Sequence, residues 1–143
     1  MPPERFPPDD PRAWLAAAAD DLALARDDLA LARADVPGLS SLEPCCFHAQ
    51  QAAEKAIKAV LLSLGVDFPR SHNLVLLLHL ARFHGLDVPA DVEAAGYLSV
   101  FAVSLRYPGP PDEPVDPEER AEAVTTAVAV LRWANAIVRP PAS

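Results

Sequence analysis

Cysteine is scarce in this sequence, and long apolar runs are missing. The two cysteines, Cys45 and Cys46, are adjacent, and neighbours on a helix point about 100° apart, which disfavours a disulfide between them. Adjacent cysteines also match no zinc-ligand spacing, so we expect two small buried side chains. No stretch approaches the roughly 20 apolar residues that span a bilayer, and the N-terminus lacks the basic-then-apolar run of a secretory signal. The sequence therefore predicts a cytoplasmic protein with no membrane segment, no metal and no other cofactor.

Basic residues are also scarce. Twelve Lys and Arg stand against twenty Asp and Glu, which gives a formal net charge of −8. The only lysines are Lys55 and Lys58. Because proteins gain affinity for nucleic acids by placing cations on phosphates, a role in nucleic-acid binding requires a local basic patch.

Glycine is the third scarcity, with five residues, whereas alanine and leucine recur at helical spacing. Many of the sixteen prolines fall at breaks: Asp10-Pro11 and Asp116-Pro117 each combine an N-cap with proline at the first helical position. No segment alternates at period two, so no strand is expected. The pattern predicts an all-α, up-and-down antiparallel bundle of about five helices, three long and two short. The expected helices cover 11–34, 43–64, 73–83, 90–105 and 117–138.

The domain is expected over residues 11–138, after a disordered arm at 1–10 and before a tail at 139–143. We expect the helices at 11–34, 43–64 and 117–138 to form the main bundle. Some apolar residues lie off the main seams of the first and last helices, and a small bundle cannot easily cover them, which favours a two-fold homodimer. These residues are Leu24, Leu31, Val130, Trp133 and Ile137.

The expected helix at 43–64 separates into two sides when it is projected at about 100° per residue. The core side carries Cys46, Ala49, Ala53, Ile57, Val60 and Leu64. The opposite side carries a polar stripe of His48, Gln51, Lys55 and Lys58. Two interpretations stay open: the stripe receives phosphate, or it is a solvated face whose lysines pair with acids of the first helix. The paired aspartates of that first helix (Asp20, Asp21, Asp27 and Asp28) are expected to look outward.

Three motifs resemble a known family. The run from Cys46 to Ala59, with Glu54-Lys55 at its centre, closely resembles the second-helix signature of HEPN domains. Ser71-His72-Asn73-Leu74 resembles the element that opens the family's third helix, and Arg106-Tyr107-Pro108 resembles the Arg-Tyr-Pro after the fourth. The resemblance covers residues 11–138. It implies an all-α bundle, usually a homodimer, which is often encoded beside a small nucleotidyltransferase and binds or acts on RNA or nucleotides.

One departure from the family pattern concerns catalysis. Ribonuclease-active HEPN domains carry a histidine a few residues after the arginine, and here those positions hold Pro111, Asp112 and Glu113. None of these side chains replaces an imidazole near neutral pH. His72 could approach Arg106 in the fold, although its alternative role is to bond the unpaired backbone groups that begin the third helix.

The resemblance and this departure favour a dimeric, non-catalytic protein that binds nucleotide or RNA phosphate, partners a small nucleotidyltransferase in a toxin–antitoxin-like pair, or does both. The alternative is a metal-independent endoribonuclease toxin, and a purely structural dimer is a third possibility. We expect no catalytic residue. The expected phosphate-binding residues are His48, Gln51, Lys55, Lys58, His72, Arg106 and Tyr107.

Overall fold

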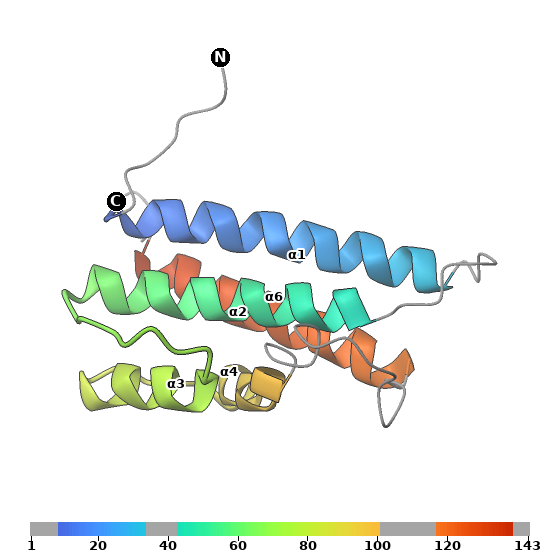
Figure 1. The fold of residues 1–143 in the computed structure, drawn as a ribbon. Coiled ribbons are helices and arrows are strands. Elements are labelled where there is room, and N and C mark those ends of the chain that lie inside the picture. The colour runs from blue at the N-terminus through green and yellow to red at the C-terminus, as the bar shows by residue number, and fades with distance from the viewer. Residues whose placement is uncertain (1–8, 34–42, 101–116, 139–143) are drawn as a thin grey trace, which may run out of the picture.

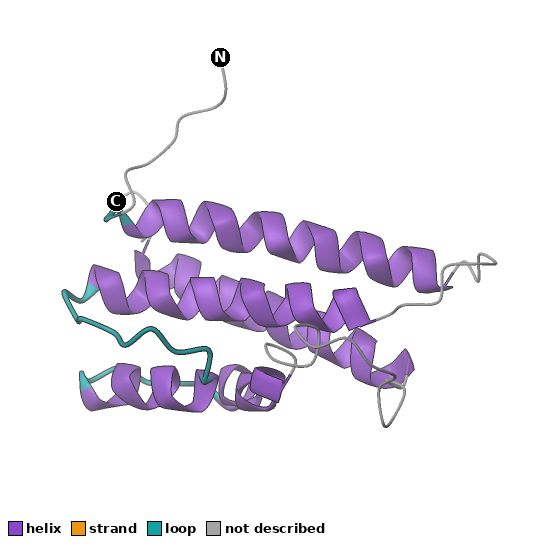
Figure 2. Ribbon diagram, viewed as in Figure 1, coloured by secondary structure: helices purple, strands orange, loops and turns teal. Residues whose placement is uncertain are grey.

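The computed structural model describes residues 9–33, 43–100 and 117–138. Within these ranges the chain forms helices and no strand (Figure 2). The elements, labelled in Figure 1 where there is room, are α1 (Pro11–Arg33), α2 (Glu43–Ser63), α3 (Leu74–Phe83), α4 (Ala90–Glu93), the 3₁₀ helix η1 (Ala94–Val100) and α6 (Pro117–Val138). The predicted all-α fold with three long helices is confirmed. The arm at 1–10 and the tail at 139–143 stay predictions.

The helix ends follow the local signals of the sequence. Asp10 caps α1, because its Oδ1 accepts from the backbone N–H of Arg12 at 2.9 Å. Gly65 ends α2 with φ of 72°, a conformation that glycine adopts without strain, and the N–H of Val66 donates back to the carbonyl of Leu61. Asn73 caps α3 with its side chain.

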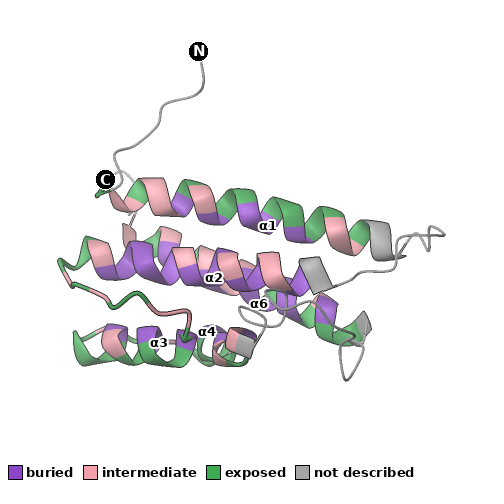
Figure 3. Ribbon diagram, in the orientation of Figure 1, coloured by how far each residue is buried: buried purple, intermediate pink, exposed green. Residues whose placement is uncertain are grey.

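Three long helices form the main bundle, as expected. α1 packs against both α2 and α6. The segment α3–α4–η1 connects α2 to α6. It returns the chain to the end of the bundle at which α2 began, so α2 and α6 run in the same direction, opposite to α1 (Figure 1). α2 is the most enclosed helix of the bundle (Figure 3).

Small side chains dominate the core between the long helices, and they allow close helix packing. Both cysteines are fully buried thiols, as predicted, and Cys45 Sγ lies 3.4 Å from the backbone carbonyl oxygen of Ala25 on α1. The core residues of these helices include Ala18, Ala25, Ala49, Ala52, Ala53, Ala56, Ile57, Ala59, Val60, Ala123, Ala127 and Ala134.

Two expectations about apolar side chains are wrong. Leu64 was expected in the core but is 39% exposed, because α2 has already ended at Ser63. Val130 was expected to lie uncovered, but the bundle buries it completely. Leu24 is 47% exposed, as the dimer argument requires, whereas Trp133 and Ile137 pack partly against the core. The side chain of Leu31 lies outside the described residues.

The predicted helix at 90–105 also differs from the structure. It begins as α4, continues as the 3₁₀ helix η1, and its part beyond residue 100 lies outside the described residues. η1 packs closely on α3: a Cβ placed on Gly96 would lie 2.8 Å from Cγ2 of Val75. The Arg82–Glu93 ion pair of 2.7 Å joins α3 to α4, and its hydrogen bond holds the pKa of Glu93 below the usual value. The segment of α4 and η1 is therefore held against α3 by tertiary contacts.

α6 is the one helix among the described residues that is long and apolar enough to cross a membrane, because an 18-residue window within Glu118–Val138 has a mean hydropathy of 1.2. By itself this is weak evidence, since a core helix of a helical bundle passes the same test. Here Ala123, Ala127, Val130 and Ala134 of α6 are fully buried inside the bundle.

Candidate functional site

The polar stripe of α2 faces the protein rather than open solvent, and it divides into two groups of charged side chains. His48 and Lys55 turn toward α1. Lys58 contacts Glu54, a residue of α2 that the sequence analysis did not single out, and Gln51 contacts Gln50, which itself contacts Glu54. We name these groups the Asp21 cluster (Asp21, Asp28, His48, Lys55) and the Glu54 cluster (Gln50, Gln51, Glu54, Lys58, His72).

The Asp21 cluster joins α1 to α2. Lys55 Nζ donates to Asp21 Oδ2 at 2.5 Å. His48 Nδ1 lies 3.4 Å from Asp21 Oδ1, which is ion-pair distance, but it makes no hydrogen bond to any described residue. His48 Nε2 lies 4.0 Å from Asp28 Oδ2. For Lys55, the interpretation as a lysine that pairs with an acid of the first helix is therefore confirmed.

The aspartates of α1 differ from the expectation in one respect. Asp20 and Asp27 are exposed as predicted, but Asp21 is buried and Asp28 is partly buried. The expectation that all four look outward is wrong, because α2 presents His48 and Lys55 to the side of α1 that carries Asp21.

The Glu54 cluster is built around a buried carboxylate. Glu54 is 4% exposed, and its Oε2 lies 3.2 Å from Nζ of Lys58, one helical turn further along α2. Lys58 is itself only 7% exposed, and its ammonium lies 5.9 Å from the ring centroid of Trp14 and 5.5 Å from that of Phe68. These two rings meet edge to face at 5.8 Å. Lys58 is therefore an enclosed cation with a carboxylate and two aromatic neighbours, not a surface charge.

Glu54 Oε1 receives the remaining donors. Gln50 Nε2 donates to it at 3.0 Å, and Gln51 Nε2 donates in turn to Gln50 Oε1 at 2.6 Å. His72 Nδ1 lies 2.7 Å from the same Oε1. An ionised carboxylate can only accept, so beside an ionised Glu54 the donor is Nδ1 of His72, and Nε2 is the other ring nitrogen.

His72 does not cap α3, the alternative role considered for it. Asn73 has that role: its Oδ1 accepts from the N–H groups of Val75 at 3.1 Å and Leu76 at 3.3 Å. The His72 side chain is 41% exposed, so the imidazole sits at the surface while its Nδ1 is tied to a buried group. This arrangement orients the ring.

The structure thus brings Gln51, Lys58 and His72 together around Glu54 and places His48 and Lys55 in the neighbouring Asp21 cluster. Arg106 and Tyr107 lie outside the described residues. Glu54 could have been found from the sequence, since an acid four residues before a lysine forms a helical ion pair. The sequence could suggest an acid of the first helix as the partner of Lys55 but could not select Asp21, because 34 residues separate the two.

Chemically, the Glu54 cluster offers one oriented imidazole and one enclosed ammonium, both held by the same carboxylate. A group of this kind can position a hydrogen-bond donor for an anion, or hold a proton acceptor in a fixed orientation. Among the described residues, no three His, Cys, Asp or Glu side chains come together to hold a metal ion.

Comparisons with known proteins identify the class. The family model described as "HEPN domain" matches residues 11–137. Among solved structures, the crystal structure of ST0689, an archaeal HEPN homologue, is similar, with a TM-score of 0.70 and 26% sequence identity over 91% of this chain and 98% of that chain. No curated protein matches the sequence.

The fold and the site define a small helical-bundle domain with a charged cluster on its second helix. The chain belongs to the HEPN domain family, whose members are generally connected with nucleotides or RNA. The family resemblance drawn from the three sequence motifs is confirmed.

Proposed function

We propose that this protein is a homodimeric, non-catalytic binding module that holds the phosphate of a nucleotide or of RNA, and that it partners a small nucleotidyltransferase in a toxin–antitoxin-like pair. The observation that carries the proposal is the 2.7 Å contact between Glu54 and His72. It holds a surface imidazole in one orientation at the start of α3. A protonated His72 donates to a phosphate oxygen from Nε2 while Nδ1 stays on Glu54.

The charges around the candidate residues indicate that these residues do not contribute equally to phosphate binding. Lys55 faces Asp21, and Lys58 faces Glu54, so much of their charge is already offset within one protomer. An acidic protein needs local cations to attract phosphate. We therefore assign the largest share of the affinity to Arg106, since the planar guanidinium of an arginine can bind phosphate through two hydrogen bonds. A smaller share goes to His72, which also contacts Glu54 but has a side chain that is 41% exposed.

We expect Arg106→Ala to weaken binding of a short labelled RNA about tenfold and His72→Ala about fivefold, because each removes a charge-assisted hydrogen bond to phosphate. Fluorescence anisotropy over a series of salt concentrations measures both changes. Loss of one phosphate contact should also reduce the slope of log affinity against log salt by ~0.7.

Arg26→Ala is the matched control, because it removes one positive charge from an exposed position on α1. It should leave the affinity within about twofold of the wild type. Wild-type protein that binds neither nucleotide nor RNA, or binding that Arg26→Ala weakens as much as Arg106→Ala, would refute the proposal.

The same Glu54–His72 contact favours a second candidate, a metal-independent endoribonuclease. A carboxylate that fixes Nδ1–H of an imidazole leaves Nε2 oriented to move a proton. If the purified protein cleaves RNA in the presence of a chelator, and His72→Ala abolishes the cleavage, the ribonuclease is the correct function. The proposed module instead binds RNA and leaves it intact.

The homodimer has a separate test. We expect light scattering to give twice the protomer mass of 15.3 kDa at micromolar concentration. Leu24 of α1 is an apolar side chain that is 47% exposed, so we place it in the dimer interface. Leu24→Asp should therefore shift the protein toward the monomer, whereas Asp20→Asn, exposed on the same helix, should not. A wild-type monomer would contradict the dimer.

Two observations test the proposed nucleotidyltransferase partner: the protein encoded by the adjacent reading frame, and co-purification of that protein with this chain. A neighbouring nucleotidyltransferase that co-purifies with this chain supports the pair. Separate elution of the two purified proteins counts against it.

A further inference from the structure

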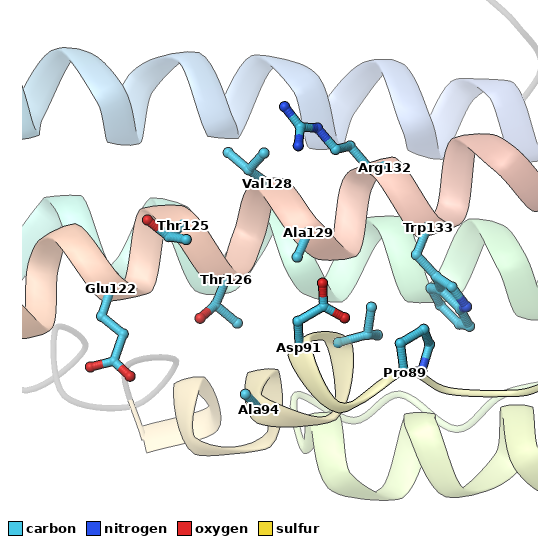
Figure 4. Close-up of a pocket in the computed structure, with 11 residues that line it drawn as sticks. Pro89, Asp91, Ala94, Glu122, Thr125, Thr126, Val128, Ala129, Arg132 and Trp133 are labelled. Atoms are coloured by element: carbon cyan, nitrogen blue, oxygen red, sulfur yellow. The ribbon is translucent and has the colours of Figure 1, made fainter.

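A groove of about 650 Å³ lies between α4 and the middle of α6, lined by residues of neither cluster on α2. Figure 4 shows its walls: Asp91 and Pro89 from the α4 side, and Glu122, Thr126 and Trp133 from α6. The volume falls within the range of small-molecule sites. The groove is therefore a candidate site separate from the one proposed for phosphate.

The charged side chains of the groove favour a cation. Asp91 and Glu122 are exposed carboxylates, and neither makes an ion pair with another described residue. The cation of the lining, Arg132, extends toward α1 and away from Asp91 (Figure 4). Two carboxylates that pair with no described cation repel phosphate and attract an ammonium group.

Tyr97 lies close to Glu122. Burial raises the pKa of the Tyr97 phenol, a hydrogen bond to Thr126 lowers it, and the nearby Glu122, Cys46 and Glu119 raise it. Thr126 is a buried hydroxyl residue of the groove lining.

The lining also has an apolar part. Ala129 and Val128 of α6 are partly exposed there, whereas Val92 is only 1% exposed and adds little surface. The Trp133 ring closes one end and is fixed by a hydrogen bond of 3.2 Å from its Nε1–H to the backbone carbonyl of Asp87. Methylene groups would be removed from water on this surface.

We propose that the groove between α4 and α6 binds a small aliphatic diamine. Its ammonium groups face Asp91 and Glu122, and its methylene chain lies on Ala129. This binding is independent of the phosphate site, and either proposal can fail without the other.

The test is a titration of the full-length protein with 1,4-diaminobutane at constant ionic strength, followed by amide chemical shifts in NMR spectra. We expect saturable shifts of Thr126, Ala129 and the Trp133 indole N–H. Asp91→Asn and Glu122→Gln should each weaken binding about fivefold, which is the upper range for a partly exposed ion pair. Asp27→Asn, an exposed carboxylate on α1, is the matched control and should change nothing.

The uncharged 1,4-butanediol and the anionic succinate should produce no saturable shifts at the same concentrations. Equal shifts with butanediol, or affinity that Asp27→Asn reduces as much as Asp91→Asn, would overturn the proposal. Tighter binding of N-acetyl-lysine methylamide than of the diamine would also overturn it, because the groove would then suit a lysine side chain of a protein partner.

Discussion

Glu54→Ala is expected to lower the free energy of unfolding by about 3–5 kcal/mol, because it leaves the Lys58 ammonium enclosed without its carboxylate. Glu54 and Lys58 are 4% and 7% exposed, and 3.2 Å separates Oε2 from Nζ. The substitution also removes the acceptor of Gln50 and His72. Equilibrium unfolding in urea, monitored by circular dichroism, measures the change.

Two further variants separate the ion pair from the rest of the cluster. The double substitution Glu54→Leu/Lys58→Met removes both charges and should recover much of the lost stability, since replacing a buried ion pair by apolar groups is often close to neutral. Lys55→Ala removes the more exposed pair with Asp21 and should cost about 1 kcal/mol or less. If Glu54→Ala costs no more than Lys55→Ala, the Glu54 cluster does not hold a buried charge in solution.

Ile57→Ala is expected to cost about 2–5 kcal/mol of unfolding free energy. Ile57 is fully buried on α2, the most enclosed helix, in a core where alanine is the commonest residue and short side chains cannot fill the cavity. Thermal and urea unfolding of the purified variant measure the loss.

Two control variants accompany the Ile57→Ala measurement: a smaller truncation at the same position and a truncation at an exposed position. Ile57→Val removes one methylene and should cost about 0.5–1.5 kcal/mol. Phe83→Ala, at a position that is 78% exposed on α3, should stay within about 0.5 kcal/mol of the wild type. Similar losses for Ile57→Ala and Phe83→Ala would mean that the packing of α2 is not as described.

The candidate site was predictable only in part. The motif around Lys55 and the element around His72, which carry the resemblance to the family, drew attention to the segments that meet at Glu54. The sequence analysis placed Lys58 on a face opposite the core, but α2 is covered on both sides. The aromatic side chains Trp14 and Phe68 enclose the lysine. The helical projection separates polar from apolar residues and does not say how many neighbouring helices cover each side.

The sequence by itself determined the elements whose signals are local. Asp10 begins α1, Gly65 ends α2 and Asn73 caps α3, since each forms its hydrogen bonds or special backbone conformation within a few residues. The tertiary structure decided the rest. The contact of Lys55 with Asp21, the meeting of His72 with Glu54 and the close approach of Gly96 to Val75 join residues that are 18 or more positions apart. Such pairs depend on how whole helices pack, and packing is set by the sum of many buried contacts rather than by any short motif.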